Sequence, residues 1–185
     1  LADKVRASFE KEFWMEEKRC LKDVVSGTKA DTQIRCNQIW AVSMPFTMLG
    51  PDKERQIVDT VFEKLYTPYG LRTLEEADPE FKPFYGGEVL KRDLAYHQGT
   101  VWAYPLGAYY TAYLKVHGYS SAAKAYVKEQ LEVMEGAMRE GCVGQLPEIY
   151  DGENPVSSKG CFAQAWSTGE ILRVYEALER QAQKR

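Results

Sequence analysis

The segment Gln145–Gly152 places a carboxylate, Glu148, between a proline and an isoleucine-tyrosine pair. Pro147 fixes its own φ and biases Leu146 toward extended conformations, and the Asp-Gly pair at the end of the segment favours a turn. We therefore expect a short, stiff connection in which the Glu148 side chain has a defined direction. General acid or base catalysis requires a carboxylate held in this way, and glycoside hydrolysis uses such groups. Most glutamates are exposed surface groups, however, so the segment alone favours an ordinary loop carboxylate.

Other residues of the types that bind sugars occur in three predicted loops. Pyranose C–H faces stack on aromatic rings, and sugar hydroxyls need fixed hydrogen-bond donors and acceptors. The loops are a stretch that ends at Gln38, residues 66–98 and residues 145–164, and short turns alternate with them. We expect these loops to gather at one end of a ring of helical hairpins. Their candidate side chains are Arg72, Asp93, His97, Gln98, Glu148 and Asp151, with the rings of Tyr69, Tyr96, Trp102, Tyr150 and Trp166.

Several of these residues also have an interpretation that involves no function. Trp102 and Trp166 lie in predicted helical stripes, where an aromatic side chain more often belongs to the core than to a sugar site. His97 is suited to cap a helix, and Asp93 with its neighbour Arg92 is suited to surface ion pairs. Nucleophilic catalysis by a cysteine and a histidine has no supporting local motif.

Composition indicates one globular domain over residues 1–185 and excludes several classes of protein. The chain is 44% hydrophobic, and its 24 Lys and Arg are dispersed among 27 Asp and Glu, so we expect no nucleic-acid partner. No run of about 18 apolar residues is present to span a membrane, and the first residues do not resemble a signal peptide. The cysteines form no CxxC pair and the histidines are far apart, so we expect reduced thiols, no metal, no cofactor and a cytoplasmic location. These residues are Cys20, Cys36, Cys142 and Cys161, with His97 and His117.

Apolar spacing predicts a succession of helices and no convincing strand. Steps of three and four residues predict helices over about residues 2–15, 51–65, 97–116, 120–140 and 162–180. Asn37 is a suitable N-cap for a further short helix, which Pro45 should kink or shorten. Residues 66–95 are predicted to be a long irregular loop, which compact domains usually keep for function. This order predicts an all-α fold of antiparallel helical hairpins rather than βαβ units.

Five motifs carry a resemblance to a known family. They resemble, in the same order, the C-terminal part of the amylo-α-1,6-glucosidase domain of glycogen debranching enzymes. The resemblance covers nearly all of this chain but only about the later half of that domain. It implies that the chain forms about half of an (α/α)₆ toroid of the glucoamylase type. It also implies hydrolysis of α-1,6-linked glucose at glycogen branches, with inversion at the anomeric carbon. The motifs are Asn37-Gln-Ile39, Leu65–Arg72, Tyr96–Trp102, Pro147–Gly152 and Gly160–Trp166.

The resemblance also implies roles for the residues that match the family motifs. Glu148 matches the family's general base, which would deprotonate the attacking water. The family's general acid is an aspartate in the earlier half of the toroid, and this chain has no matching stretch. Asp93 and Asp151 are the only nearby candidates for that role here. The residues that would line the glucose subsite are His97, Gln98 and Trp102, with Arg72, Asp93, Gln38 and Trp166 as weaker candidates.

Two other functions stay open on the sequence. One is a non-catalytic carbohydrate-binding or scaffold module derived from such a toroid, and the other is a toroid glycosidase for another linkage, such as a trehalose-like or mannosyl linkage. The chain begins at Leu1 without an initiator methionine, and we expect it to be a piece of a longer protein whose upstream part supplies the acid. The expected partner is an α-glucan such as glycogen or limit dextrin. Half a toroid would expose apolar helix faces, so we also expect self-association or contact with an upstream domain.

Overall fold

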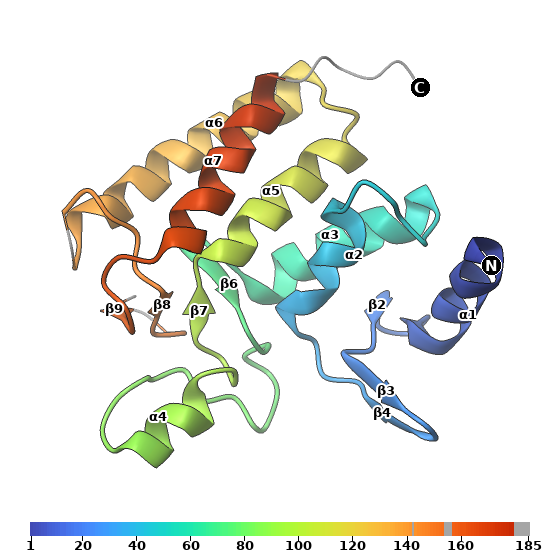
Figure 1. The fold of residues 1–185 in the computed structure, drawn as a ribbon, viewed down its shortest axis with the longest axis horizontal. Coiled ribbons are helices and arrows are strands. Elements are labelled where there is room, and N and C mark those ends of the chain that lie inside the picture. Colours follow the sequence, from blue (N-terminus) through green and yellow to red (C-terminus); the bar gives the residue numbers. More distant parts are fainter. Residues whose placement is uncertain (142, 154–156, 180–185) are drawn as a thin grey trace.

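The computed structural model describes residues 1–141, 143–153 and 157–179 and consists mainly of helices joined by short strands (Figure 1). Cys142, one of the cysteines predicted to be reduced, lies outside the described residues. The helices are α1 (Ala2–Phe13), α2 (Trp40–Ser43), α3 (Pro51–Leu65), α4 (Val89–Ala95), α5 (Tyr104–Val116), α6 (Ser121–Glu135) and α7 (Ala165–Glu179), with the 3₁₀ helices η1 (Cys36–Ile39) and η2 (Gly136–Arg139). The strands are β1 (Trp14–Met15), β2 (Cys20–Leu21), β3 (Val24–Ser26), β4 (Lys29–Asp31), β5 (Tyr66–Thr67), β6 (Gly70–Arg72), β7 (Val101–Trp102), β8 (Ile149–Tyr150) and β9 (Ser158–Lys159).

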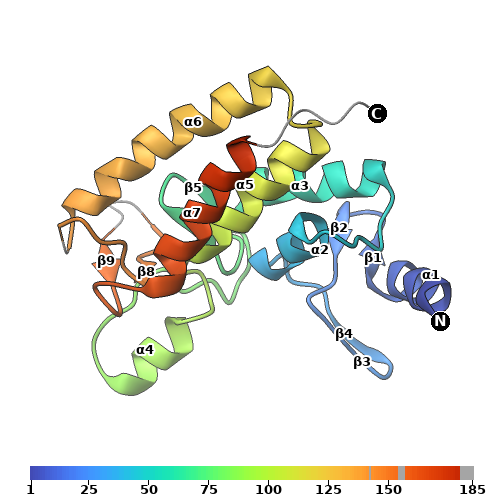
Figure 2. The ribbon, with the colours of Figure 1, turned by 45° about the horizontal axis from the view of Figure 1, so that its top comes forward.

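The core is built around α5, which is buried on nearly every side. Leu106, Tyr109 and Leu114 of this helix are all buried, and α3, α6 and α7 pack around it. α5 and α6 form an antiparallel hairpin, and α7 lies beside α5 with the opposite direction to α6 (Figure 2). The axes of α5 and α7 come so close that a Cβ on Gly107 would lie 2.5 Å from the carbonyl oxygen of Glu170. The close contact fixes the position of the N-terminal half of α7 relative to α5.

A five-stranded antiparallel sheet, in the order β5-β6-β7-β8-β9, lies at the end of the helices where α5 and α7 begin (Figure 1). Trp102 of β7 is opposite Leu71 of β6 on one side and Ile149 of β8 on the other. β7 is followed almost directly by α5, and β8 begins one residue after Glu148. The sheet therefore brings the Glu148 loop beside the start of α5, although about 45 residues of chain separate them.

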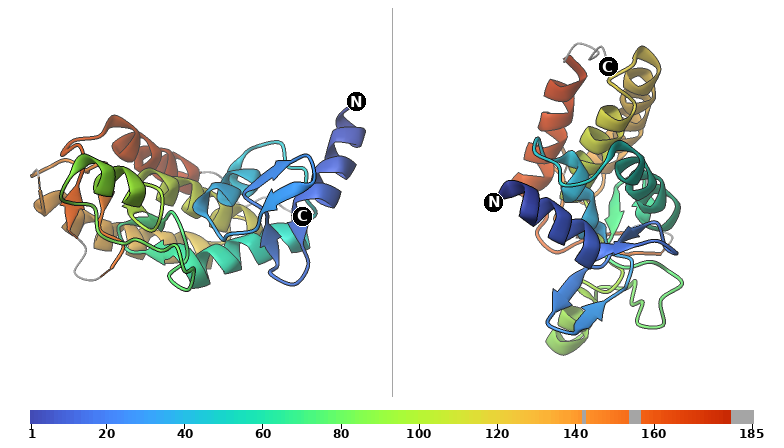
Figure 3. Two further views of the ribbon diagram at one scale, coloured as in Figure 1. Left: turned by 90° about the horizontal axis from the view of Figure 1, so that it is seen from below. Right: turned by 90° about the vertical axis from the view of Figure 1, so that its right-hand side faces the viewer.

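The N-terminal part consists of α1 and two small hairpins, β1-β2 and β3-β4. Phe9 and Phe13 of α1 stack with ring centroids 4.9 Å apart and pack against the core, as their spacing predicted. Val5, which belongs to the same predicted stripe, is 49% exposed. α1 ends at Phe13 because Trp14 is extended and pairs with Leu21 of β2. Figure 3 shows these hairpins well separated along the molecule from α4 and the five-stranded sheet.

The prediction of an all-α fold is only partly correct, because the connections between helices form sheets. The helices predicted over 51–65, 120–140 and 162–180 are present as α3, α6 with η2, and α7; residue 180 lies outside the described residues. The helix predicted from residue 97 instead begins at Tyr104, because Pro105 occupies its first turn and residues 101–102 pair as β7. Trp102 is therefore on a strand and not in a helical stripe.

The predicted loop over residues 66–95 is also more regular than expected. It contains β5, β6 and α4, and only the part between β6 and α4 is irregular. Asn37 does not cap a helix, because it lies inside η1 and its side chain donates to Asp23. α2 ends at Ser43, two residues before Pro45, as the proline predicted. None of the described helices is both long and apolar enough to cross a membrane.

Candidate active site

Glu148 is held by contacts on both of its carboxylate oxygens. The hydroxyl of Tyr96 donates to Oε1 over 2.5 Å, and the backbone N–H of Cys161 donates to Oε2 over 3.1 Å. The backbone N–H of Glu148 donates to the carbonyl oxygen of Cys161 over 2.8 Å. The buried hydroxyl of Ser167, on the first turn of α7, donates to the carbonyl oxygen of Pro147 over 2.9 Å. The main chain and side chain of Glu148 are thus both fixed, and its carboxylate remains partly exposed.

The polypeptide can approach Glu148 this closely because residue 160 is a glycine. Gly160 has a φ of +67°, which L side chains rarely adopt. A Cβ at this position would collide with Oε2 of Glu148. Gly160 therefore serves both the turn after β9 and the contact between Cys161 and the carboxylate.

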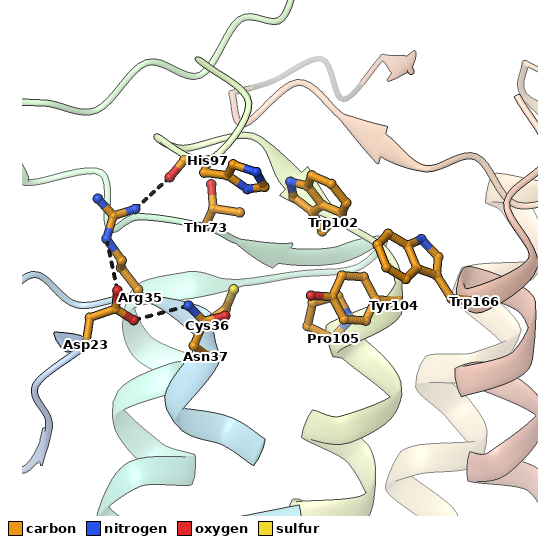
Figure 4. Close-up of a pocket in the computed structure, with 10 residues that line it drawn as sticks. All are labelled: Asp23, Arg35, Cys36, Asn37, Thr73, His97, Trp102, Tyr104, Pro105 and Trp166. Carbon is orange, nitrogen blue, oxygen red and sulfur yellow. Dashed lines mark hydrogen bonds and ion pairs between the residues drawn. The ribbon is translucent and has the colours of Figure 1, made fainter. Parts of the chain in front are cut away.

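A pocket of about 290 Å³ adjoins the Tyr96 ring through His97 and Trp102, and Glu148 itself is not among its lining residues. Figure 4 shows the two unlike walls of this pocket. One wall is aromatic and the other carries charged and amide groups. Trp102, Tyr104 and Trp166 come from the end of β7 and from the first turns of α5 and α7. On the polar side, Asp23 follows β2, and Arg35 and Asn37 lie at the start of η1. The lining residues are Asp23, Arg35, Cys36, Asn37, Thr73, His97, Trp102, Tyr104, Pro105 and Trp166.

The aromatic wall is a continuous set of ring contacts. Tyr104 and Trp166 stack with ring centroids 4.6 Å apart, and Trp102 meets Trp166 edge-on at 5.8 Å. His97 stacks on Trp102 at 5.2 Å with an interplanar angle of 14°. Trp102 is only 4% exposed, whereas Trp166 is 46% exposed. Flat, partly exposed rings of this kind provide a surface for the C–H face of a sugar.

The polar wall is organised by Arg35. Its guanidinium donates to the carbonyl oxygen of His97 over 2.6 Å and to the side chain of Gln98 over 2.7 Å. Its Nε lies 3.8 Å from Asp23, and the Asn37 amide donates to the same carboxylate over 3.1 Å. The Arg35 and Asp23 side chains are 13% and 14% exposed, so their orientation is set by the protein rather than by solvent.

Sequence reasoning predicted a part of this pocket and missed another part. The pocket lining contains three of the predicted site residues, His97, Trp102 and Trp166. Gln98 does not line it, but its side chain accepts a hydrogen bond from Arg35, which does. Asp23, Arg35 and Asn37 were not among the predicted site residues. Arg35 and Asn37 lie within three residues of Gln38, in the predicted loop that ends there, whereas Asp23 had no local signal.

Besides Gln98, three predicted binding residues lie outside the pocket lining and make structural contacts or face solvent. Gln38 is buried, accepts from the backbone N–H of Leu21 over 3.2 Å, and donates to the carbonyl oxygen of Arg35 over 3.0 Å. Asp93 is exposed on α4. Arg72 donates to the carbonyl oxygen of Gly152 over 2.9 Å and pairs with Glu76 at 2.7 Å. The functional roles of these three residues stay predictions.

The pKa values of two groups that line the pocket, His97 and Cys36, are shifted from their usual values. Burial, followed by the positive charge of Arg35, lowers the pKa of His97 below its usual value, although Glu148 acts in the opposite direction. Burial and the charge of Arg35 both favour the neutral form of the His97 ring. Burial raises the pKa of the Cys36 thiol to about 12, so this cysteine, which lines the same pocket as His97, stays protonated and is unsuited to nucleophilic catalysis. Within the described ranges, no group of three His, Cys, Asp or Glu side chains is placed to hold a metal ion.

Comparisons with known proteins show the family of the chain and the class of its fold. Residues 1–173 match the family described as amylo-α-1,6-glucosidase. The glycogen debranching enzyme of Saccharomyces cerevisiae is 26% identical over 164 residues, which cover 78% of this chain and 11% of that enzyme. The structure of neutral trehalase from Saccharomyces cerevisiae, a toroid glycosidase, matches with a TM-score of 0.63 and 16% identity, over 96% of this chain and 30% of that chain. The chain thus spans about a tenth of the debranching enzyme, and its likeness to the trehalase concerns the fold alone. By the match over residues 1–173, the chain belongs to the amylo-α-1,6-glucosidase family.

Proposed function

We propose that this chain forms part of the active site of a glycoside hydrolase that removes α-1,6-linked glucose from branch points of glycogen or limit dextrin. Membership of the amylo-α-1,6-glucosidase family supports this class of reaction. The observation that carries the proposal is the fixed carboxylate of Glu148, held by Tyr96 and Cys161 in the same region as a pocket with one aromatic and one polar wall.

In this proposal Glu148 is the general base of an inverting mechanism. One of its oxygens takes a proton from a water molecule as the oxygen of that water bonds to the anomeric carbon. The bond from this carbon to O6 of the glucan breaks, and a general acid protonates the departing O6. The products are β-glucose and a linear glucan chain. The base and the acid in such a mechanism lie about 6.5–9.5 Å apart, which leaves room for the water.

We place the general acid outside this chain, in the earlier part of an (α/α)₆ toroid of which these hairpins form about half. Among the described residues that line the pocket, Asp23 is the one carboxylate, and it is engaged by Arg35 and Asn37. Asp151 is buried, accepts from the backbone N–H of Tyr85 over 2.8 Å and lies 3.7 Å from Lys159. Asp93 faces solvent on α4. These placements favour structural or binding roles for all three aspartates.

The pocket itself suits a single sugar ring. A volume of about 290 Å³ is at the lower limit of small-molecule sites, which span about 300–1,000 Å³. Trp166 and Tyr104 offer a ring face to the sugar, and Arg35, Asn37 and Asp23 offer donors and an acceptor to its hydroxyls. We propose that the terminal glucose of the branch enters here, with the remaining glucan outside.

We also propose a cytoplasmic setting for this reaction. Cys20, Cys36 and Cys161 are free thiols in the structure, and reduced cysteines are typical of that compartment.

The first test is substitution of Glu148 in the full-length protein. Glu148→Gln removes the base but keeps the shape of the side chain, so kcat for release of branch glucose should fall by about 10²–10⁴-fold. Binding of the glucan, measured by isothermal calorimetry, should persist. Glu153→Gln is the matched control, because Glu153 is an exposed glutamate on the same segment. Full turnover by Glu148→Gln would remove Glu148 from the mechanism.

The linkage and the stereochemistry are tested by following product formation with NMR. We expect β-glucose as the first product from a limit dextrin with α-1,6-linked branches, and little reaction with trehalose or α-mannosides. A first product in the α form would contradict inversion. Preferential cleavage of trehalose would instead support a toroid glycosidase of another specificity, and glucan binding without turnover would support a non-catalytic module.

A further inference from the structure

We infer that Tyr96 is a positioning residue that holds the carboxylate of Glu148 in a fixed position relative to the aromatic wall of the pocket. The inference rests on the proposed function of Glu148 as general base, and it adds a residue that acts through that base. Tyr96 does not line the pocket. Its contribution follows from contacts made at both its ends, the side-chain hydroxyl and the backbone carbonyl.

The side chain of Tyr96 reaches the base. Its hydroxyl donates to Oε1 of Glu148 over 2.5 Å, which is short for a hydrogen bond between two oxygens and typical of one with a charged acceptor. Burial is the main cause that raises the pKa of Tyr96 above its usual value, and the hydrogen bond to Glu148 acts in the same direction. The phenol therefore remains protonated, and remains a hydrogen-bond donor, at neutral pH.

The backbone of Tyr96 reaches the aromatic wall. Its carbonyl oxygen accepts from the indole N–H of Trp102 over 2.9 Å and from the hydroxyl of Thr100 over 2.7 Å. The phenol ring also contacts Trp102 and His97, with centroids 4.7 Å away in each case. One residue thus connects the carboxylate that activates water with the rings that contact the sugar.

The two donors to Glu148 restrict its carboxylate to one orientation. Cys161 fixes Oε2 from the turn after β9, and Tyr96 fixes Oε1 from the end of α4. Without the phenol hydroxyl, rotation about the last side-chain bond of Glu148 is opposed from one side only. The free lone pairs of the base would then point toward the water in a smaller share of molecules.

The experiment compares Tyr96→Phe with Tyr85→Phe in the full-length protein, with α-glucosyl fluoride as substrate. Fluoride leaves without help from a general acid, so the rate reports on the base. Tyr85 is the matched control, because its ring lies 5.5 Å from that of Tyr96 and only Tyr96 donates to Glu148 among these two residues. We expect Tyr96→Phe to lower kcat by about 10–100-fold, as small misplacements of a catalytic group do, with KM nearly unchanged. Tyr85→Phe should retain the kcat of the unmodified enzyme.

A second pair of variants separates positioning of the base from a general structural role. In Glu148→Ala, azide can attack the anomeric carbon from the face opposite to fluoride, so that a C–N bond forms while the C–F bond breaks and fluoride carries away the electron pair. The product is β-glucosyl azide, and no base is required. The second variant of this pair carries both Glu148→Ala and Tyr96→Phe. If Tyr96 acts only through Glu148, this double variant and the single variant Glu148→Ala will have equal azide-dependent rates.

The outcomes distinguish the two proposals. An azide-dependent rate that falls when Tyr96→Phe is added would show that Tyr96 supports the site independently of Glu148 and would overturn this inference. Equal kcat for Tyr96→Phe, Tyr85→Phe and the unmodified enzyme would also overturn it, while a large loss in Glu148→Ala would leave the proposed base intact. Unchanged kcat in Glu148→Ala would instead contradict the proposed function itself.

Discussion

The geometry around Glu148 depends on a residue with no side chain as much as on any side chain. Gly160 has a backbone conformation that favours glycine, and its Cα faces the carboxylate. The next residue, Cys161, provides the backbone N–H that binds Oε2. A side chain at residue 160 would therefore strain the turn and push the carboxylate away from its donor at the same time.

Gly160→Ala should accordingly lower both stability and turnover. A left-handed conformation costs a residue with a Cβ about 1–2 kcal/mol, and the collision with Glu148 adds to this. Gly27→Ala is the matched control, because Gly27 has a φ of +59° and a Cβ there would have nothing within 4 Å. Urea denaturation should show a loss of unfolding free energy in both variants, at least as large for Gly160→Ala. Only Gly160→Ala should lose kcat in the full-length protein, and equal turnover by the two variants would contradict the role assigned to Gly160.

The elements of the fold differ in how far the sequence predicts them. α3 is found at its predicted bounds, because Pro51 marks its first turn and its apolar stripe continues to Leu65. The strands of the five-stranded sheet have two or three residues each, which is too short for an alternating pattern to be visible. Their existence depends on pairing between distant segments, such as Arg72 with Val101 and Val101 with Tyr150. This non-local pairing is why a stretch that looked irregular contains strands.

The same distinction between local and non-local information applies to the candidate site. The sequence neighbours of Glu148 make it a candidate, since Pro147 and the following turn predict a stiff connection. The pairing of Asp23 with Arg35 depends on how the β3-β4 hairpin folds back toward η1. The sequence around Asp23 does not predict this pairing. Gln38 belongs to the same motif as Asn37, which lines the pocket, but its side chain accepts from the backbone N–H of Leu21. Motif membership alone does not say which side chains of a motif face the pocket.

The contact between α5 and α7 makes a prediction at the scale of elements. Gly107→Ala should destabilise the protein by about 1–3 kcal/mol, the usual result of overpacking, because its Cβ would meet the backbone of Glu170. α7 would be displaced, and Trp166 on its first turn would move with it. Gly169→Ala is the matched control within α7, since a Cβ there has nothing within 4 Å.

The two alanine substitutions should therefore have opposite effects in thermal or urea unfolding. Gly169→Ala should stabilise the protein by about 0.5–1 kcal/mol, since alanine favours the helix interior. Stabilisation by Gly107→Ala would show that α7 can move away from α5 at no cost, and it would contradict the idea that their contact positions Trp166.

For the molecule as a whole, the distribution of apolar side chains is uneven. The side of α7 that faces α5 is buried through Ile171 and Val174, whereas Leu172 is 62% exposed and Tyr175 is 46% exposed. Leu172 and Tyr175 are three residues apart and so share one face of the helix. An apolar helix face of this kind is what a neighbouring hairpin would cover in a complete toroid, and it favours association when the face is left open.

We therefore expect this chain, when expressed alone, to self-associate through the exposed face of α7. Light scattering coupled to size-exclusion chromatography should give a mass that rises with protein concentration. Leu172→Lys should shift the distribution toward the monomer, because a charge at the centre of the face must be desolvated on association. Ala125→Lys adds the same charge at an exposed position of α6 and should leave association unchanged, which separates the effect of the apolar face from that of net charge. A compact monomer at all concentrations for the unmodified chain would show that the exposed residues of α7 do not drive association.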